Sequence, residues 1–241
     1  ASPRAERLAV RLLAVGIAAL VLFPALAKSG IWDPYELDAA DLGRRIAVRV
    51  FHAASLEIPG STSVLPTLTD LKMGELPFTS MALGFRAFGL HDWTGRLPLA
   101  IWGFLGVVAL YELLARLIDK RAGLFAAIAL VTMPLYFMQA RTMLGDIVTM
   151  ASVTIGFVGF TGAMLDDVGE EETKSFGLAR LAWFALGLVG VAAGFMCRGF
   201  LIGVAVANLS ADPDDSTGVL YQLDPQSGVA TKLGTGLFST T

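Results

Sequence analysis

The segment IVTMASVTIGFVGFTGAML, residues 147–165, carries no charged residue along its whole length. A helix needs roughly 20 residues to cross the hydrocarbon core of a bilayer, and this segment is close to that length. Four more runs are almost free of charge: Leu12–Ala27, Leu97–Tyr111, Ala122–Ala140 and Leu181–Cys197. A soluble domain can bury one such helix but not five, so the sequence predicts an integral membrane protein.

The composition agrees with this class of protein. Of 241 residues, 55% are hydrophobic and only 16% are charged, whereas soluble domains carry about 25% charged residues. A single cysteine, Cys197, excludes an internal disulfide, and two histidines cannot form a histidine-rich metal site. We therefore expect neither a metal nor another cofactor, and no nucleic-acid partner.

Basic residues beside the apolar runs predict the orientation, because cytoplasmic flanks are enriched in Lys and Arg. Such residues precede the first run and follow the second: Arg4, Arg7, Arg11, Arg116, Lys120 and Arg121. Both flanks, and with them the N-terminus, are expected in the cytoplasm. The membrane is expected to be the inner membrane of a bacterial cell. The long loop Lys28–Gly95 and the short loop around QARTMLGD then lie on the extracytoplasmic side.

The long loop contains a segment, residues 33–51, with the pattern of an amphipathic helix. Apolar residues recur at helical spacing on one side, and charged residues line the other: Ala39, Leu42, Ile46 and Val50 against Asp38, Asp41, Arg45 and Arg49. Such a helix is expected to lie in the membrane interface. The segment FTSMALGFRAFGL, residues 78–90, is apolar but too short to span.

The sequence changes character after Leu209 and becomes polar and rich in turn-forming residues. Its segment VLYQLDPQSGVATKLG predicts a strand, a turn and a second strand, similar to one hairpin of a β-propeller repeat. The predicted fold is therefore all-α: a polytopic bundle of five to six spans in residues 1–209, with an extracytoplasmic loop helix. A polar, β-like tail occupies residues 210–241, as expected of a fusion or a frameshifted end.

The stretch Asp33-Pro34-Tyr35-Glu36, directly after the first run, has two interpretations. As structure, Asp33 is a good N-cap, Pro34 suits the first helical position, and Glu36 completes a capping box. As a site, Glu36 falls near the apolar side of the helix, where a carboxylate is costly unless it is used. The two interpretations are compatible in one residue.

A second set of charged residues is predicted on the same side of the membrane. Arg141 and Asp146 flank the short loop, Arg96 begins the second run, and Arg198 ends the fifth. Arg141 could instead reach toward the headgroups, and Asp146 could cap a helix. Together these side chains suit an anionic headgroup, since the planar guanidinium grips phosphate through two hydrogen bonds.

These motifs, in this order, resemble the bacterial membrane glycosyltransferases related to protein O-mannosyltransferases and the aminoarabinose transferase of lipid A, which have the GT-C fold. The similarity rests on WDPYE at residues 32–36 followed by Arg44 and Arg45, on HDWTGRLP at 91–98, and on PLYFMQARTMLGD at 134–146. It covers residues 8–209. Relatives have about twice as many spans, so the resemblance implies the N-terminal part of such an enzyme.

The resemblance implies transfer of a sugar from a polyprenyl-phosphate donor to a lipid or protein acceptor on the extracytoplasmic face. Asp33 or Glu36 would act as the base on the acceptor hydroxyl. Arg141 and Arg96 would bind the leaving phosphate, with Asp146 as the second acidic position. Many relatives carry Lys where this chain has Glu75, and Lys72 is the nearby substitute.

Two other classes of function remain open. A non-catalytic membrane subunit or scaffold would keep the fold and act with other protein subunits, which could add a strand to the tail. A transporter is less consistent with the sequence, because the middles of the apolar runs lack ionisable residues. Convergence of the acidic and basic residues on one cavity would favour the enzyme over the scaffold.

Overall fold

The computed structural model describes residues 3–28, 30–31, 34–61, 63–71, 74–165, 178–198, 219–223 and 230–235. The chain divides into two compact units, Ala1–Gly199 and Phe200–Thr241. Each is considered separately below.

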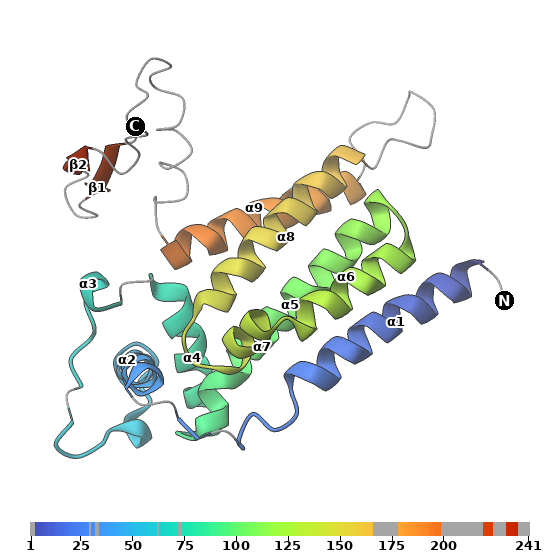
Figure 1. Ribbon diagram of the computed structural model, residues 1–241. Helices are drawn as coiled ribbons and strands as arrows, with labels where there is room; N and C mark the ends of the chain where they lie inside the picture. Colours follow the sequence, from blue (N-terminus) through green and yellow to red (C-terminus); the bar gives the residue numbers. More distant parts are fainter. Residues whose placement is uncertain are drawn as a thin grey trace. The chain divides into compact units, whose positions relative to one another are not determined.

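The first unit is a helical bundle (Figure 1). Its elements are α1 (Pro3–Leu22), α2 (Tyr35–Arg49), the 3-10 helix η1 (Ala54–Leu56), α3 (Leu68–Leu71), α4 (Glu75–Phe88), α5 (Asp92–Leu117), α6 (Lys120–Thr132), α7 (Pro134–Arg141), α8 (Asp146–Leu165) and α9 (Leu178–Arg198). The prediction of an all-α membrane fold is confirmed.

The number of membrane-crossing helices is smaller than the predicted five to six within the described residues. Three helices are long and apolar enough to cross a membrane, in α5, α8 and α9. A fourth span is formed only if α6 and α7, which meet at a bend of 66°, count as one broken span. Pro134 begins α7, where its missing N–H costs nothing. The predicted first run corresponds to α1, whose apolar part, Leu8–Leu22, is shorter than a span.

The loop helix α2 packs against α4 through small residues. Ala40, Gly43 and Ala47 are buried, and a Cβ at Gly43 would lie 3.1 Å from the Cβ of Met81. The predicted apolar side was wrong in part, because Val50 is exposed while Ala47 is fully buried. Figure 1 shows α2 end-on while α1 and α8 are seen from the side, so α2 runs across the direction of the long helices.

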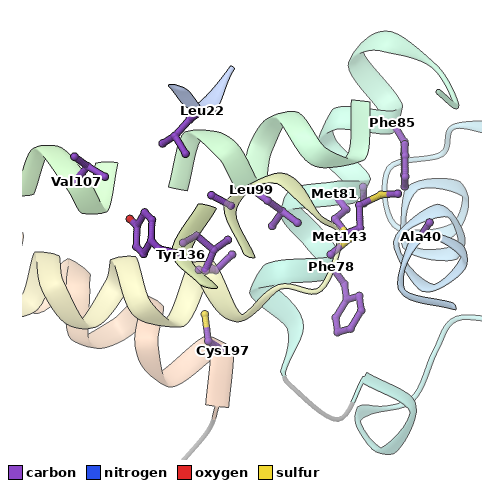
Figure 2. Close-up of a cluster of buried hydrophobic side chains, with 14 of the residues drawn as sticks. Leu22, Ala40, Phe78, Met81, Phe85, Leu99, Val107, Tyr136, Met143 and Cys197 are labelled. Carbon is purple, nitrogen blue, oxygen red and sulfur yellow. The ribbon is translucent and has the colours of Figure 1, made fainter. Parts of the chain in front are cut away.

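A shared core joins these helices (Figure 2). Phe85 of α4, Leu99 of α5 and Met143 of the α7–α8 loop belong to one cluster of buried hydrophobic side chains. Side-chain hydrogen bonds add to it: the Tyr136 hydroxyl donates to the Gly103 carbonyl oxygen at 2.6 Å. The indole N–H of Trp102 donates to Ser80 Oγ at 3.2 Å. The helices around this core are therefore held in fixed register.

The crossing of α8 and α9 depends on glycine. A Cβ at Gly159 would fall on the backbone N and Cα of Gly187 and 2.8 Å from the Trp183 carbonyl oxygen. Small residues let membrane helices approach this closely. Because a backbone cannot yield as a flexible side chain does, the crossing requires glycine at position 159.

We expect Gly159→Ala to lower the free energy of unfolding by about 1–3 kcal/mol, the usual cost of overpacking. Unfolding of the purified chain in detergent, followed by circular dichroism, measures this. Gly156→Ala is the matched control on the same helix, since the nearest atom to its added Cβ lies at 3.7 Å. Equal losses in the two variants would show that the close crossing is not the cause.

The second unit contains the predicted hairpin. Strands β1 (Val219–Leu223) and β2 (Ala230–Thr235) pair antiparallel, with a register shift between Leu220 and Tyr221. The turn that joins them lies outside the described residues.

Candidate functional site

The centre of the candidate site is a buried ion pair between α2 and α5. Arg96 Nε donates to Glu36 Oε1 at 2.7 Å, and Arg96 Nη2 donates to Glu36 Oε2 at 2.8 Å. Both side chains are only 1% exposed. Two parallel N–H···O bonds of this kind form the strongest geometry for an arginine and a carboxylate.

Backbone groups complete the pair and tie in two more segments. Arg96 also donates to the carbonyl oxygens of Leu26 and Gly30, both at 2.9 Å, in the connection between α1 and α2. The N–H of Met143, in the α7–α8 loop, donates to Glu36 Oε1 at 2.9 Å. One ion pair therefore joins α2 and the connection before it to two segments far along the chain, the start of α5 and the α7–α8 loop.

Glu36 was expected as a base and Arg96 as a phosphate ligand, and both roles require a side chain that a substrate can reach. A base must reach the acceptor hydroxyl, and a phosphate ligand must offer free N–H groups. In the structure both oxygens of Glu36 accept hydrogen bonds, and Nε, Nη1 and Nη2 of Arg96 all donate within the protein. At 1% exposure, neither side chain meets a substrate in this arrangement.

Arg141 lies at the same end of the bundle and binds the end of α1. Its Nη1 donates to the carbonyl oxygens of Val21 at 2.9 Å and Leu22 at 3.4 Å, in the last turn, where helix carbonyls lack partners. Its guanidinium also lies 4.8 Å from the centre of the Phe137 ring. Nε and Nη2 make no hydrogen bond within the described residues, so the edge of the guanidinium that these two atoms form stays available.

Asp146 is the first residue of α8 and is partly exposed; its carboxylate in the first turn suits the helix dipole, and its predicted role as a cap stays a prediction. Its Oδ2 accepts a long hydrogen bond, 3.5 Å, from Nε2 of Gln139 on α7. Asp146 and Arg141 thus occupy the two sides of the short loop that carries Met143.

A cavity of about 230 Å³ opens beside the ion pair. Its wall includes Met143, whose N–H binds Glu36, and Ile31, next to the bound carbonyl of Gly30. The remaining wall is apolar with four polar side chains, Asp41, Arg44, His91 and Asp92. Ligand pockets usually measure about 300–1,000 Å³, so this cavity suits the reacting end of a molecule rather than a whole lipid.

Asp41 organises the charges in this wall. Its Oδ1 accepts from Arg44 Nη2 at 2.7 Å and its Oδ2 accepts from Arg45 Nε at 2.7 Å. Arg44 is buried and also reaches the Leu56 carbonyl oxygen at 3.5 Å. Asp41 and Arg45 stand four residues apart, a spacing at which oppositely charged side chains meet on a helix, but no pattern in the sequence indicated that Arg44 would be buried.

Sequence reasoning did not assign a role to the polar wall residues His91 and Asp92. The turn that places them begins at Gly89, which has φ +82° and ends α4, a conformation that favours glycine. The Thr94 hydroxyl then donates to the Gly89 and His91 carbonyl oxygens, each at 2.8 Å, and fixes the start of α5. The sequence signal that could have identified His91 and Asp92 was their position in the HDWTGRLP motif.

Three of the expected site residues cannot be located. Asp33 and Lys72 lie outside the described residues, and the side chain of Arg198 does too. In the part of the chain that the structure describes, no three His, Cys, Asp or Glu side chains gather as metal ligands would.

Two solved structures are similar in fold. They are crystal structures of ArnT from Cupriavidus metallidurans, one in the apo state and one bound to undecaprenyl phosphate. The TM-score is 0.63 in both comparisons, with 19% and 21% sequence identity. The match covers 82% of this chain but 34% of ArnT, so the chain spans about a third of that protein's length.

Among curated proteins, none matches this chain. A family model does match: that of dolichyl-phosphate-mannose-protein mannosyltransferase, over residues 76–210. This range is more than half of the 241 residues. It includes α5 to α9 and all of α4 but its first residue, the helices that form the larger part of the bundle. The chain therefore belongs to the dolichyl-phosphate-mannose-protein mannosyltransferase family.

Proposed function

We propose that this chain forms the N-terminal part of a membrane glycosyltransferase that takes a sugar from a polyprenyl-phosphate donor. The acceptor is a lipid or protein hydroxyl, and the reaction takes place at the end of the bundle that carries α2, α4 and the α7–α8 loop. Membership of the mannosyltransferase family supports the reaction class. The ArnT structure bound to undecaprenyl phosphate, with a similar fold, supports the type of donor.

The observation that carries the proposal is the Glu36–Arg96 pair with its backbone partners. By joining α2, α5, the α1–α2 connection and the α7–α8 loop, it holds cavity walls from different segments in fixed positions. Reactive sites need such a rigid supporting shell, because small displacements of reacting groups are costly.

Within this frame we assign the base role to Asp33, because both oxygens of Glu36 are already bound. Ile31, two residues before Asp33 in the chain, lines the cavity. Arg141 binds the donor phosphate through Nε and Nη2, and Lys72 and Arg198 add positive charge. Asp146 is the second acidic group of the site. By the distribution of Lys and Arg, this end faces away from the cytoplasm.

Binding of undecaprenyl phosphate to the purified chain in detergent tests the donor site. We expect saturable binding by microscale thermophoresis that weakens about tenfold in Arg141→Ala, since a charged hydrogen bond contributes about 1.5–3 kcal/mol. Arg86→Ala is the control, because Arg86 is an exposed arginine that also lies over an aromatic ring, that of Phe51 at 5.6 Å.

Transfer is measured with the same sample and a panel of undecaprenyl-phosphate sugars, with membrane extract as the source of acceptor. Release of free undecaprenyl phosphate in the presence of acceptor supports the enzyme. Saturable binding without release from any donor would leave a lipid-binding subunit. Absence of binding would favour the scaffold interpretation.

A further inference from the structure

A second and larger cavity lies at the other end of the helical unit. It measures about 930 Å³ and is lined by the start of α1, the end of α5, the α5–α6 connection and the C-terminal half of α8. None of these segments contributes to the candidate glycosyl-transfer site. Three cationic side chains line it: Arg11, Arg116 and Lys120.

Arg116 is held in a layered arrangement beside this cavity. Its guanidinium carbon lies 4.1 Å from the centre of the Trp183 ring. The same ring also packs closely against Gly162 of α8, where an added Cβ would lie 2.8 Å from Trp183 Cδ2. A guanidinium stacked on an indole keeps its N–H groups available at its edge, and its orientation is already fixed. Within the described residues Arg116 makes no hydrogen bond or ion pair.

The carboxylates around the cavity, in the part of the chain that the structure describes, are each engaged by another group. Glu112 pairs with Arg11 at 2.6 Å, and Asp119 Oδ1 accepts from the Ala122 N–H at 2.6 Å and caps α6. Lys120 pairs with Glu6, and this hydrogen bond lowers the pKa of the Glu6 carboxyl. Among the described cationic side chains that line the cavity, Arg116 is thus the one without a carboxylate partner, and its position over the Trp183 ring orients it to bind an anion.

The rim of the cavity is apolar. Leu8 of α1 is 57% exposed and Ile118 is 70% exposed, and both line the opening. Leu12, one turn along α1 from Leu8, is 60% exposed. A charged interior beside an exposed aliphatic edge matches a molecule with an anionic head and a hydrocarbon chain. Tryptophan at this depth is typical of the membrane–water boundary.

We infer that this cavity binds the phosphate of an anionic phospholipid headgroup, held by the edge of the Arg116 guanidinium. The acyl chains lie along the exposed leucines of α1, Leu8 and Leu12. The basic flanks place this end in the cytoplasmic leaflet, where anionic lipids attract Lys and Arg. The inference is independent of the proposed transfer reaction, which uses the opposite end of the bundle.

Native mass spectrometry of the delipidated full chain tests the site. Phosphatidylglycerol and phosphatidylcholine with identical acyl chains are the probes, and inorganic phosphate and glycerol 3-phosphate are added as competitors. We expect phosphatidylglycerol to bind about tenfold more tightly than phosphatidylcholine, and Arg116→Gln to remove this preference. Arg86→Gln, the other arginine on an aromatic ring, is expected to keep it.

Two further variants protect the test against misfolding. Trp183→Phe keeps an aromatic face and is expected to keep the preference for phosphatidylglycerol. Arg116→Lys keeps the charge but cannot form two parallel hydrogen bonds to one phosphate, so it is expected to lose part of this preference. Equal binding of the two lipids, or equal effects of Arg116→Gln and Arg86→Gln, would overturn the inference. Full competition by millimolar inorganic phosphate would overturn the lipid as the ligand and leave a free-phosphate site.

Discussion

Replacing Glu36 by glutamine is expected to lower the free energy of unfolding by about 3–5 kcal/mol, the cost of leaving one partner of a buried ion pair without the other. The new side chain would turn an amide N–H₂ or a weaker acceptor toward Arg96, whose guanidinium is 1% exposed and cannot turn to water. Chemical unfolding of the purified chain in mixed micelles, followed by tryptophan fluorescence, measures the loss. Asp38→Asn, an exposed position two residues along the same helix, is the control and is expected to change stability by less than about 0.5 kcal/mol.

The double variant Glu36→Leu/Arg96→Met sharpens this expectation. Because it removes both charges, it avoids the uncompensated ion, and its loss is expected to be well below the sum of the two single variants. It still remains less stable than the parent chain, since the carbonyl oxygens of Leu26 and Gly30 and the Met143 N–H lose their hydrogen bonds. Additive losses would mean that the two side chains contribute independently, which the bidentate geometry does not allow.

The sequence indicated that Glu36 was unusual but could not identify its partner. Helical spacing placed the carboxylate near the apolar side of α2, where burial requires a compensating group. Arg96 lies 60 residues further along the chain, and a hydrophobic pattern carries no information on pairing at that distance. Sequence analysis therefore treated the two residues as separate substrate contacts, and only the structure shows that they bind one another.

The ends of the apolar runs were harder to predict than their existence. The first run continues to Ala27, but α1 ends at Leu22, because the residue before Pro24 is disfavoured in the helical conformation. The end of α1 leaves carbonyl groups without helical partners, and Arg141 binds two of them. A chain read only for its hydrophobicity shows neither the early end nor the need for this contact.

The packing face of α2 was mispredicted in part for a related reason: Ile46 is buried as predicted, but Val50 is exposed. Hydrophobicity favours large apolar residues such as Leu42, whereas the small residues Ala40, Gly43 and Ala47 are buried, and Gly43 lies against Met81 of α4. Close approach of two helices rewards small side chains, and a hydrophobic scale gives them little weight. The same limitation applies to the crossing of α8 and α9 at Gly159 and Gly187.

Exchange of Asp33 for asparagine is expected to separate catalysis from stability. If Asp33 is the base of the proposed transfer, Asp33→Asn lowers the rate of undecaprenyl phosphate release by about 10²–10⁴-fold, the usual contribution of general-base catalysis. Affinity for undecaprenyl phosphate stays unchanged, because the proposed phosphate ligand is Arg141, with Nε and Nη2 available. Assays stopped at fixed times, with the protein at a concentration far below that of the donor, measure the rate of undecaprenyl phosphate release. Thermophoresis measures the affinity for undecaprenyl phosphate.

The comparison with Glu36→Gln decides between the two acidic residues, because Glu36 is already engaged within the protein. Glu36 accepts bonds from Arg96 and Met143, so its variant is expected to lose stability first and activity only in proportion to the folded fraction. Asp33→Asn is expected to keep the unfolding curve of the parent chain and lose the reaction. The reverse outcome, a stable Glu36→Gln that binds donor but does not release it, would assign the base to Glu36 and require the Arg96 pair to open during the reaction.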